Sequence, residues 1–449
     1  MMNTPICEFV SAYQKRNALR LHMPGHKGLT QIGPEAYDIT EIDGADVLYA
    51  AQGIIRESEE NASRLFETGC TLYSAEGSSL CIRAMVYLAG LYARQTGRKP
   101  LIAAARNAHK VFMTAAALMD VDICWLYPAE SGSVVSCRLD LEETERILRK
   151  EKPVALYVTS PDYLGNSADL RALSKICRAN DVLLMVDNAH GAYLKFLPAS
   201  RHPIDLGADL CCDSAHKTLP VLTGGAYLHL SAKAPEILST HAENALSLFA
   251  STSPSYLILQ SLDQANRYLA DGYGNKLADA ALMLARARAQ VQAHGYEMQG
   301  DEPLKWTLAP KSLGYRGEEL AQKLQEKNIV VEFADPDFVV MMFTPEMTED
   351  QIHSVVRELT RLPKRGAITE RPPVLSRPLQ RMPAREALFS MQETIPVEEA
   401  LGRILAAASV TCPPAVPVVV CGEAIDESAI WCFQYYGIEK VTVVKETDC

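Results

Sequence analysis

Residues 204–220, IDLGADLCCDSAHKTLP, join an apolar run to a histidine and a lysine that stand side by side. The run is short, rich in leucine and cysteine, and closed by polar residues, which predicts a buried strand ending near Cys212. Ser214, His216 and Lys217 follow directly on that strand. A lysine at the end of a buried strand indicates chemistry, because its amine can form an imine with an aldehyde.

Apolar runs typical of strands alternate with segments of helical periodicity from about residue 60 to residue 230. The strand-like runs stand at 100–105, 154–160 and 182–187, and the helix-like segments at 78–95, 111–119 and 169–180. This alternation predicts an α/β domain with a doubly wound, mostly parallel sheet. The continuous Val, Leu and Ile content of the runs fits strands that helices cover on both faces.

Polar residues follow four of these strands, at the point where each one ends. The groups are Arg106 to His109, Thr159 to Pro161, Asp187 with His190, and Ser214 with His216 and Lys217. One such group alone is ordinarily the start of a loop. Because open α/β sheets bind ligands at the carboxyl ends of their strands, four groups together predict one shared crevice.

The four groups and one further turn fit the chemistry of a single cofactor. Lys217 supplies an amine for an aldehyde. Asp187 ends the apolar run VLLMVD, where a carboxylate needs a cationic partner such as a protonated ring nitrogen. His109 offers a flat face for stacking on a ring. The stretch YSAEGSS opens a helix whose backbone N–H groups suit a phosphate, at Gly77, Ser78 and Ser79.

An aldehyde, a protonated ring nitrogen, a stacking face and a phosphate together describe pyridoxal 5'-phosphate. A cofactor-free Schiff-base aldolase is the competing interpretation, since it also needs a lysine, but it has no use for a phosphate site. EGSS by itself is also typical of a plain helix N-cap. Asp187 and the Gly77 to Ser79 turn are the features that separate these classes of enzyme.

Composition restricts the partners and the compartment. The 449 residues carry 44 basic against 55 acidic side chains, a net charge of -11, which argues against nucleic acid as the main partner. The N-terminus has no signal-like apolar core and the apolar runs are too short to cross a bilayer, so we expect a cytoplasmic protein without a membrane partner. The twelve cysteines show no metal-ligand spacing, so we expect no metal site and buried reduced thiols, including Cys124, Cys211 and Cys212.

Seven motifs occur in an order that resembles the ornithine/lysine/arginine decarboxylases of the aspartate-aminotransferase fold. They are LHMPGHKG at 21–28, EGSS at 76–79, RNAHK at 106–110, TSPDYLG at 159–165, VDNAHGAY at 186–193, SAHKTLP at 214–220 and STSPSYLILQSLD at 251–263. The resemblance extends from residue 21 to about residue 423 and is to the short members that lack an N-terminal receiver-like domain. It implies fold type I of the pyridoxal-phosphate enzymes, with a large sheet domain, a small α+β domain and a C-terminal α+β domain.

The resemblance implies a role for each polar group. Lys217 would hold the cofactor through a Schiff base, Asp187 would pair with its ring nitrogen, and His109 would stack on its ring. His190 would approach the phenolic oxygen. The phosphate ligands would be Ser78, Ser79, Ser214 and His216. The segment with Ser251, Thr252 and Ser253 would reach the phosphate of the neighbouring subunit, which implies a homodimer or higher homo-oligomer with shared active sites.

The implied activity is decarboxylation of arginine, lysine or ornithine to the corresponding amine. His216, Lys217 and Tyr163 are candidates for the group that returns a proton to the α-carbon. In the family the N-terminal motif lies at the rim of the active site, so His26 and Lys27 are candidate substrate-side groups. Glu332 is a candidate for the same role or an exposed residue at a strand edge.

Three departures from the family pattern leave the substrate open. Asn188 stands where the family usually has Glu, Asp162 where it usually has Thr, and CPPAVPVVVCGE at 412–423 differs from the usual pattern. The catalytic core is intact, yet these changes lie where we expect the substrate side chain or a C-terminal lid. Two alternatives therefore stay open: another amino-acid reaction with the same cofactor, and a non-catalytic relative that regulates or inhibits a partner.

Periodicity and composition divide the chain into five parts. We expect a rim segment (1–36), a large cofactor-binding α/β domain (37–275), a small α+β domain (276–360), a Pro/Arg-rich linker (361–383) and a small C-terminal domain (384–449). Beyond the large domain, strands are predicted at 304–310, 328–335, 337–344 and 416–423. Helices are predicted at 276–295, 317–327, 348–359, 384–410 and 426–437.

Overall fold

The computed structural model describes residues 2–129, 136–374, 376–411 and 416–446. The chain divides into two compact units. Unit 1 comprises Met1–Leu101, Lys152–Tyr157 and Leu170–Asn275, and unit 2 comprises Ile102–Glu151, Val158–Asp169 and Lys276–Cys449. The domain limits expected at residues 36, 275, 360 and 383 stay a prediction.

One sheet has seven strands, in the order β1-β7-β6-β5-β4-β2-β3. The strands are β1 (Cys70–Ser74), β2 (Leu101–Ala105), β3 (Asp122–Leu126), β4 (Ala155–Thr159), β5 (Leu183–Asp187), β6 (Leu210–Asp213) and β7 (Ala226–Leu230). β5 and β6 are parallel, whereas β7 runs antiparallel to both β6 and β1. The predicted α/β class with a mostly parallel sheet is therefore confirmed, with β7 reversed between β1 and β6.

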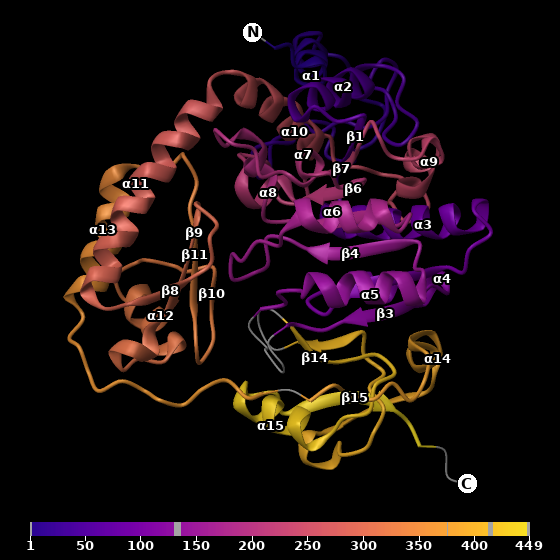
Figure 1. The fold of residues 1–449 in the computed structure, drawn as a ribbon. Helices are drawn as coiled ribbons and strands as arrows, with labels where there is room; N and C mark the ends of the chain where they lie inside the picture. The colour runs from indigo at the N-terminus through magenta and orange to yellow at the C-terminus, as the bar shows by residue number, and fades with distance from the viewer. Residues whose placement is uncertain (1, 130–135, 375, 412–415, 447–449) are drawn as a thin grey trace. The chain divides into compact units, whose positions relative to one another are not determined.

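In unit 1, helices cover the strands that carry the predicted site. The predicted helix at 78–95 is confirmed as α3 (Gly77–Gln95), which packs on β7 and on α9 (Glu236–Ser247). Three more helices pack against one another in the same unit (Figure 1): α1 (Pro5–Lys15), α2 (Ile54–Phe66) and α10 (Tyr256–Ala270). Next to β5 and β6, α6 (Leu170–Ala179) packs on β5 and α7 (Pro203–Leu206) on β6, while α8 (Ala215–Thr218) packs on β7 and on the 3-10 helix η1 (Ala192–Phe196).

Unit 2 contains a four-stranded antiparallel sheet in the order β10-β11-β9-β8. Its strands are β8 (Glu297–Gln299), β9 (Lys305–Ala309), β10 (Phe333–Ala334) and β11 (Val339–Met342). The helices of this part are α11 (Tyr273–His294), which begins in unit 1, the 3-10 helix η2 (Pro310–Leu313), α12 (Gly317–Gln325) and α13 (Glu349–Arg361). Nearer the start of the unit, α4 (Lys110–Met119) follows β2 and α5 (Leu141–Glu151) follows β3.

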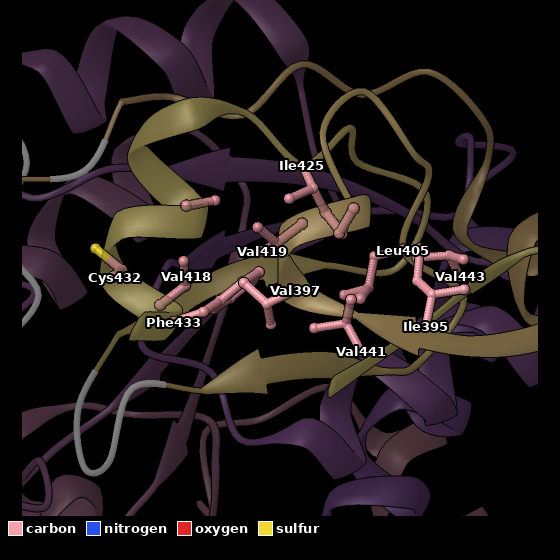
Figure 2. Close-up of a cluster of buried hydrophobic side chains, with 12 residues drawn as sticks. Ile395, Val397, Leu405, Val418, Val419, Ile425, Cys432, Phe433, Val441 and Val443 are labelled. Atoms are coloured by element: carbon pink, nitrogen blue, oxygen red, sulfur yellow. The ribbon is translucent and has the colours of Figure 1, made fainter. Parts of the chain in front are cut away.

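The C-terminal part of unit 2 has an apolar core of its own. Its elements are α14 (Ala384–Phe389), β12 (Gln392–Pro396), η3 (Val397–Glu399), β13 (Ser409–Thr411), β14 (Pro417–Val420), α15 (Glu427–Tyr435) and β15 (Lys440–Val444). β12 pairs with β15 and β13 with β14. Figure 2 shows Val397, Leu405, Val419 and Val441 in one buried cluster, which Phe433 of α15 completes. The predicted strand near 416 and the helix near 426 are thus confirmed.

Two predicted elements were wrong. The segment 384–410 is not one helix, because the buried side chains of β12 and the residues after it alternate with period two at Ile395 and Val397, and Pro396 cannot donate within a helix. The strand expected at 328–335 shrinks to β10, because Asn328 takes a left-handed turn after α12 (φ 58°) and Val330 is exposed. In both places apolar content alone predicted the wrong length or type of element.

Ten cysteines within the described residues are free thiols, and six of them are buried. Cys211 and Cys212 lie in the core as expected, but Cys124 is only partly buried because β3 is covered less completely. Among the described helices, none has both the length and the apolar character required of a membrane span.

Candidate active site

Asp187 ends β5 and is buried, at 3% exposure. Two groups donate hydrogen bonds to its carboxylate. The Tyr157 hydroxyl donates to Oδ2 at 3.1 Å, and the Ala189 N–H donates to Oδ1 at 3.2 Å. The Cys212 thiol lies 3.7 Å from Oδ1, since Asp187 and Cys212 are register partners in the parallel ladder. The carboxylate is therefore held in one orientation by strands on both sides of β5.

Lys217 lies in α8, which begins two residues after β6 ends. Its side chain is partly buried, and its Nζ lies 3.1 Å from Nε2 of the buried His190. His190 follows Asp187 by three residues in the turn after β5. The ends of β5 and β6 thus bring together the lysine, the histidine and the turn that Asp187 opens, as the sequence predicted.

The start of α3 has the features of an anion site. Gly77 takes a positive φ of 71°, which turns the chain sharply into the helix. Glu76 stands at the N-cap but makes no side-chain cap, because its carboxylate accepts the Ser251 N–H at 2.6 Å instead. The Ser214 hydroxyl donates to Ser78 Oγ at 2.8 Å, so hydroxyls from the N-cap of α8 and from α3 meet there. EGSS therefore opens α3 without a side-chain cap, and its role as a phosphate site stays a prediction.

His216 and Ser79 complete this part of unit 1. Both side chains are partly buried. His216 Nδ1 lies 3.0 Å from the Gly225 carbonyl oxygen, so Nδ1 carries the hydrogen and the ring is fixed to the backbone that precedes β7. A Cβ added at Gly77 would meet only His216 Cε1, at 4.0 Å, which places the imidazole at the edge of the Gly77 turn.

Ser251, Thr252 and Ser253 are exposed in a loop between α9 and α10. Their chain is held to the turn before α3 by the Ser251 N–H, which donates to Glu76, while the Ser253 N–H donates to Ser251 Oγ. The rim motif is also ordered locally: His26 Nε2 lies 3.2 Å from Asp38 Oδ2, and Lys27 Nζ donates to the His22 carbonyl at 2.6 Å.

His109, Tyr163 and Glu332 belong to unit 2. His109 is exposed at the N-cap of α4, where its Nδ1 accepts the Val111 N–H at 3.2 Å. The Tyr163 hydroxyl donates to Glu332 Oε1 at 3.0 Å, and Tyr163 also packs edge-on against Phe333. Glu332 is therefore a hydrogen-bonded acid beside an aromatic pair, and the approach of these groups to a cofactor stays a prediction.

Arg106 forms a buried ion pair within unit 2. Its guanidinium makes two hydrogen bonds of 2.7 Å to the Glu423 carboxylate, and both side chains are 2% exposed. The guanidinium carbon also lies 5.1 Å from the ring centroid of Trp125 and 5.5 Å from that of Tyr127. The positive charge of Arg106 is therefore paired within unit 2, where the ion pair links the residue after β2 to Glu423 of the C-terminal part.

Sequence reasoning missed two residues that hold Asp187. Tyr157 lies within the strand-like run VALYVTS, and Cys212 within LCC, so both were assigned to the core alone. A tyrosine inside an otherwise aliphatic buried strand is a usable signal, because its hydroxyl needs a partner when buried.

Known proteins resemble this chain over most of its length. The chain matches the family model for the Orn/Lys/Arg decarboxylase major domain over residues 4–300, and that for the C-terminal domain over residues 376–441. An arginine decarboxylase of Bacillus subtilis (strain 168) is 30% identical over 463 residues, covering 95% of this chain and 92% of that protein. An arginine decarboxylase of Halalkalibacterium halodurans is also 30% identical, covering 95% and 91%.

Two solved structures share the fold over nearly the whole chain. The lysine decarboxylase LdcF of Francisella novicida superposes with a TM-score of 0.80 at 17% identity, covering 98% of this chain and 81% of that chain. The constitutive lysine decarboxylase of E. coli gives a TM-score of 0.79 at 18% identity, covering 99% and 82%. At this identity the structural likeness concerns the fold alone.

Proposed function

Because this chain belongs to the Orn/Lys/Arg decarboxylase family, we propose that it removes the α-carboxylate of arginine, with Lys217 and Asp187 as the two residues that hold the cofactor. The chain is a pyridoxal 5'-phosphate-dependent decarboxylase of a basic amino acid. Arginine is the proposed substrate because the relatives that cover the chain almost from end to end are named arginine decarboxylases. The observation that carries the proposal is the 3.1 Å approach of Lys217 to His190 beside Asp187.

The residues of unit 1 fit pyridoxal 5'-phosphate. A partly buried amine at Lys217 suits the aldehyde, and a buried carboxylate at Asp187 suits the ring nitrogen. The N-terminus of α3 has no side-chain cap, and Ser78 and Ser214 add hydroxyls to it, as a phosphate site requires. When bound, this cofactor supplies an electron sink for the negative charge left on the α-carbon by the departing carbon dioxide.

Asp187 would hold the proton of the cofactor's ring nitrogen in place. The Tyr157 hydroxyl, the Ala189 N–H and the Cys212 thiol fix the carboxylate before any ligand arrives, so little reorganisation is needed. Lys217 would form the covalent link to the cofactor, and His190, 3.1 Å from its amine, would orient it. His216, Lys217 and Tyr163 are the three candidates that return a proton to the α-carbon.

The active unit is proposed to be a homodimer or higher homo-oligomer in which Ser251 and Thr252 serve the neighbouring active site. In the single chain these side chains are exposed. Exposed apolar side chains accompany them in unit 1, namely Leu19, Leu21, Leu29, Ile32, Leu222 and Leu248. Burial against a second copy would remove these apolar side chains from water. His109 is proposed to stack on the cofactor ring, because it offers a flat aromatic face at the N-cap of α4.

The protein is proposed to work in the cytoplasm. The ten described cysteines are free thiols, and several stand in the core beside the site, where a reducing compartment keeps them unmodified.

The direct experiment is to load purified protein with pyridoxal 5'-phosphate and supply carboxyl-labelled arginine, lysine and ornithine in turn. We expect labelled carbon dioxide and the matching amine, with the largest kcat/KM for arginine, and no release from Lys217→Ala. Release from lysine or ornithine alone would reject arginine as the substrate. Release from none of the three would reject the assignment of function.

A further inference from the structure

A buried polar network lies on the opposite face of the strands that carry Asp187 and Cys212. These two residues are register partners of β5 and β6, and successive side chains of a strand point to opposite faces. The next residues along the two strands are Asn188 and Asp213, which therefore face each other away from Asp187. The Asn188 side-chain amide donates to Asp213 Oδ1 at 2.7 Å.

Polar side chains approach Asp213 from three sides. Besides Asn188, His202 Nε2 lies 3.1 Å and His229 Nε2 lies 3.3 Å from Asp213 Oδ2. His229 Nδ1 lies 2.8 Å from the Thr71 hydroxyl, which extends the network through β7 to β1. Asn188, Asp213 and both histidines are 0% exposed. Four strands of unit 1 are therefore tied together around one carboxylate.

The surroundings of Asp213 favour its ionised carboxylate. Burial opposes ionisation of Asp213, but His202 and His229 beside it lower its pKa below the usual value. Burial lowers the pKa of His229, whose Nε2 lies 3.3 Å from Asp213 Oδ2. Cys211 Sγ stands 3.9 Å from His202 Nε2, and the ligand atoms of His202, Cys211 and Asp213 are close enough to hold a metal ion. Because three nitrogen atoms already surround the Asp213 carboxylate, we assign the cluster to hydrogen bonding.

Gly191 locks the Asn188 side chain into this arrangement. An added Cβ at Gly191 would collide with Asn188 Oδ1, at a distance that no side chain tolerates. The Gly191 N–H also donates to the Asn188 carbonyl at 2.8 Å. The turn that leads from Asp187 to His190 is therefore built around the position of the Asn188 amide.

We propose that Asn188 and Asp213 are a complementary pair of positioning residues, which fix the ends of β5 and β6 and thereby set Asp187 and Lys217 for the cofactor. The inference rests on the proposed function, because the cofactor is what the two strand ends are set to receive. It also explains a departure noted in the sequence: the family usually has Glu where this chain has Asn188. A carboxylate at that position would face the carboxylate of Asp213, whereas the amide donates to it.

The test exchanges the two side chains, which differ in one donor group and hardly in shape. Asn188→Asp places two carboxylates in hydrogen-bond contact, and Asp213→Asn leaves two amides there. The double variant Asn188→Asp with Asp213→Asn restores one acceptor and one donor with the polarity reversed, and the amide oxygen introduced at position 213 still accepts from the histidines. Asn328→Asp, at an exposed turn of unit 2, is the matched control.

Three readouts are taken on every variant: the Kd for pyridoxal 5'-phosphate by absorbance titration, the absorption maximum of the bound cofactor across pH 6 to 9, and the thermal midpoint. Because a hydrogen bond to a charged group is at stake, we expect Asn188→Asp to raise the Kd about tenfold or more and to shift the pH dependence of the absorbance. We expect the double variant to recover most of the affinity and the original absorbance profile. Asn328→Asp should match the wild type.

The outcomes separate this inference from the proposed function. If the wild type binds the cofactor and the exchanged double variant is no better than Asn188→Asp, or the single variant equals the wild type, the pair does not position the site. If the wild type does not bind the cofactor at all, the proposed function fails. If the double variant recovers the thermal midpoint but not the affinity for the cofactor, the pair has a structural role only. A stoichiometric metal that is lost with Cys211→Ser would overturn the hydrogen-bond assignment.

Discussion

Replacing Glu423 by glutamine should destabilise unit 2, because it removes the negative half of a buried ion pair. The Glu423 carboxylate accepts two bonds of 2.7 Å from Arg106, and its Oε2 also accepts the Val420 N–H at 2.9 Å. A glutamine oxygen at the Oε2 position keeps two of these bonds, but the amide nitrogen then faces a guanidinium N–H. Removing one partner of a buried pair costs about 3–5 kcal/mol, and the two retained bonds place the expected loss near the lower end, about 3 kcal/mol.

Urea unfolding followed by tryptophan fluorescence measures this loss well, since Trp125 lies 5.1 Å from the Arg106 guanidinium. The control is Glu143→Gln, which breaks an exposed Arg146 pair on α5 and should leave the unfolding midpoint unchanged. The double variant Arg106→Met with Glu423→Leu should recover part of the stability, because no charge is then left unpaired. An unfolding midpoint for Glu423→Gln equal to that of Glu143→Gln would refute the reasoning.

Three further substitutions probe the site and the small sheet of unit 2. Asp187→Asn should retain some cofactor but lower kcat about 10²–10³-fold in the decarboxylation assay, because it removes the charge that holds the ring proton; an unchanged kcat would exclude that role. Gly77→Ala should lower the free energy of unfolding by about 1–2 kcal/mol, because φ 71° strains an alanine while the added methyl meets only His216 Cε1 at 4.0 Å; a urea midpoint equal to that of the wild type would count against it. Burial raises the pKa of Asp335 to about 7, because the folded protein favours the protonated carboxyl. The stability that this protonated carboxyl contributes is therefore complete below about pH 4 and is lost as the pH rises to about 7. Asp335→Asn should therefore gain stability relative to the wild type between pH 5 and pH 8, by up to about 4 kcal/mol in urea unfolding, and parallel pH profiles would show that the carboxyl does not titrate there.

The alternating part of the fold was predictable from sequence because buried parallel strands need continuous apolar runs. The strands around Met185 and Cys211 and the helix from Gly77 to Gln95 were located within a few residues. The C-terminal part was not, since the apolar residues between 384 and 410 fit a helix as well as a strand until β15 supplies a partner for β12. Pairing across the chain, rather than local periodicity, decides such a segment.

The candidate site shows the same division. Lys217, Asp187 and Gly77 were predictable because each breaks an apolar run or opens a helix with chemistry that a core does not need. The Arg106–Glu423 pair joins residues 317 positions apart, and no local pattern records it. Asn188 was recognised as a departure from the family, but its partner Asp213 became visible only when the register of β5 and β6 placed the two side by side.

Reduction with borohydride of the protein loaded with pyridoxal 5'-phosphate, followed by peptide mass spectrometry, tests the central claim most directly. We expect a single pyridoxyl adduct on the peptide that contains Lys217, and none on that peptide in Lys217→Ala. An adduct on another lysine, with Lys217 unmodified, would contradict the assignment of Lys217 to the cofactor.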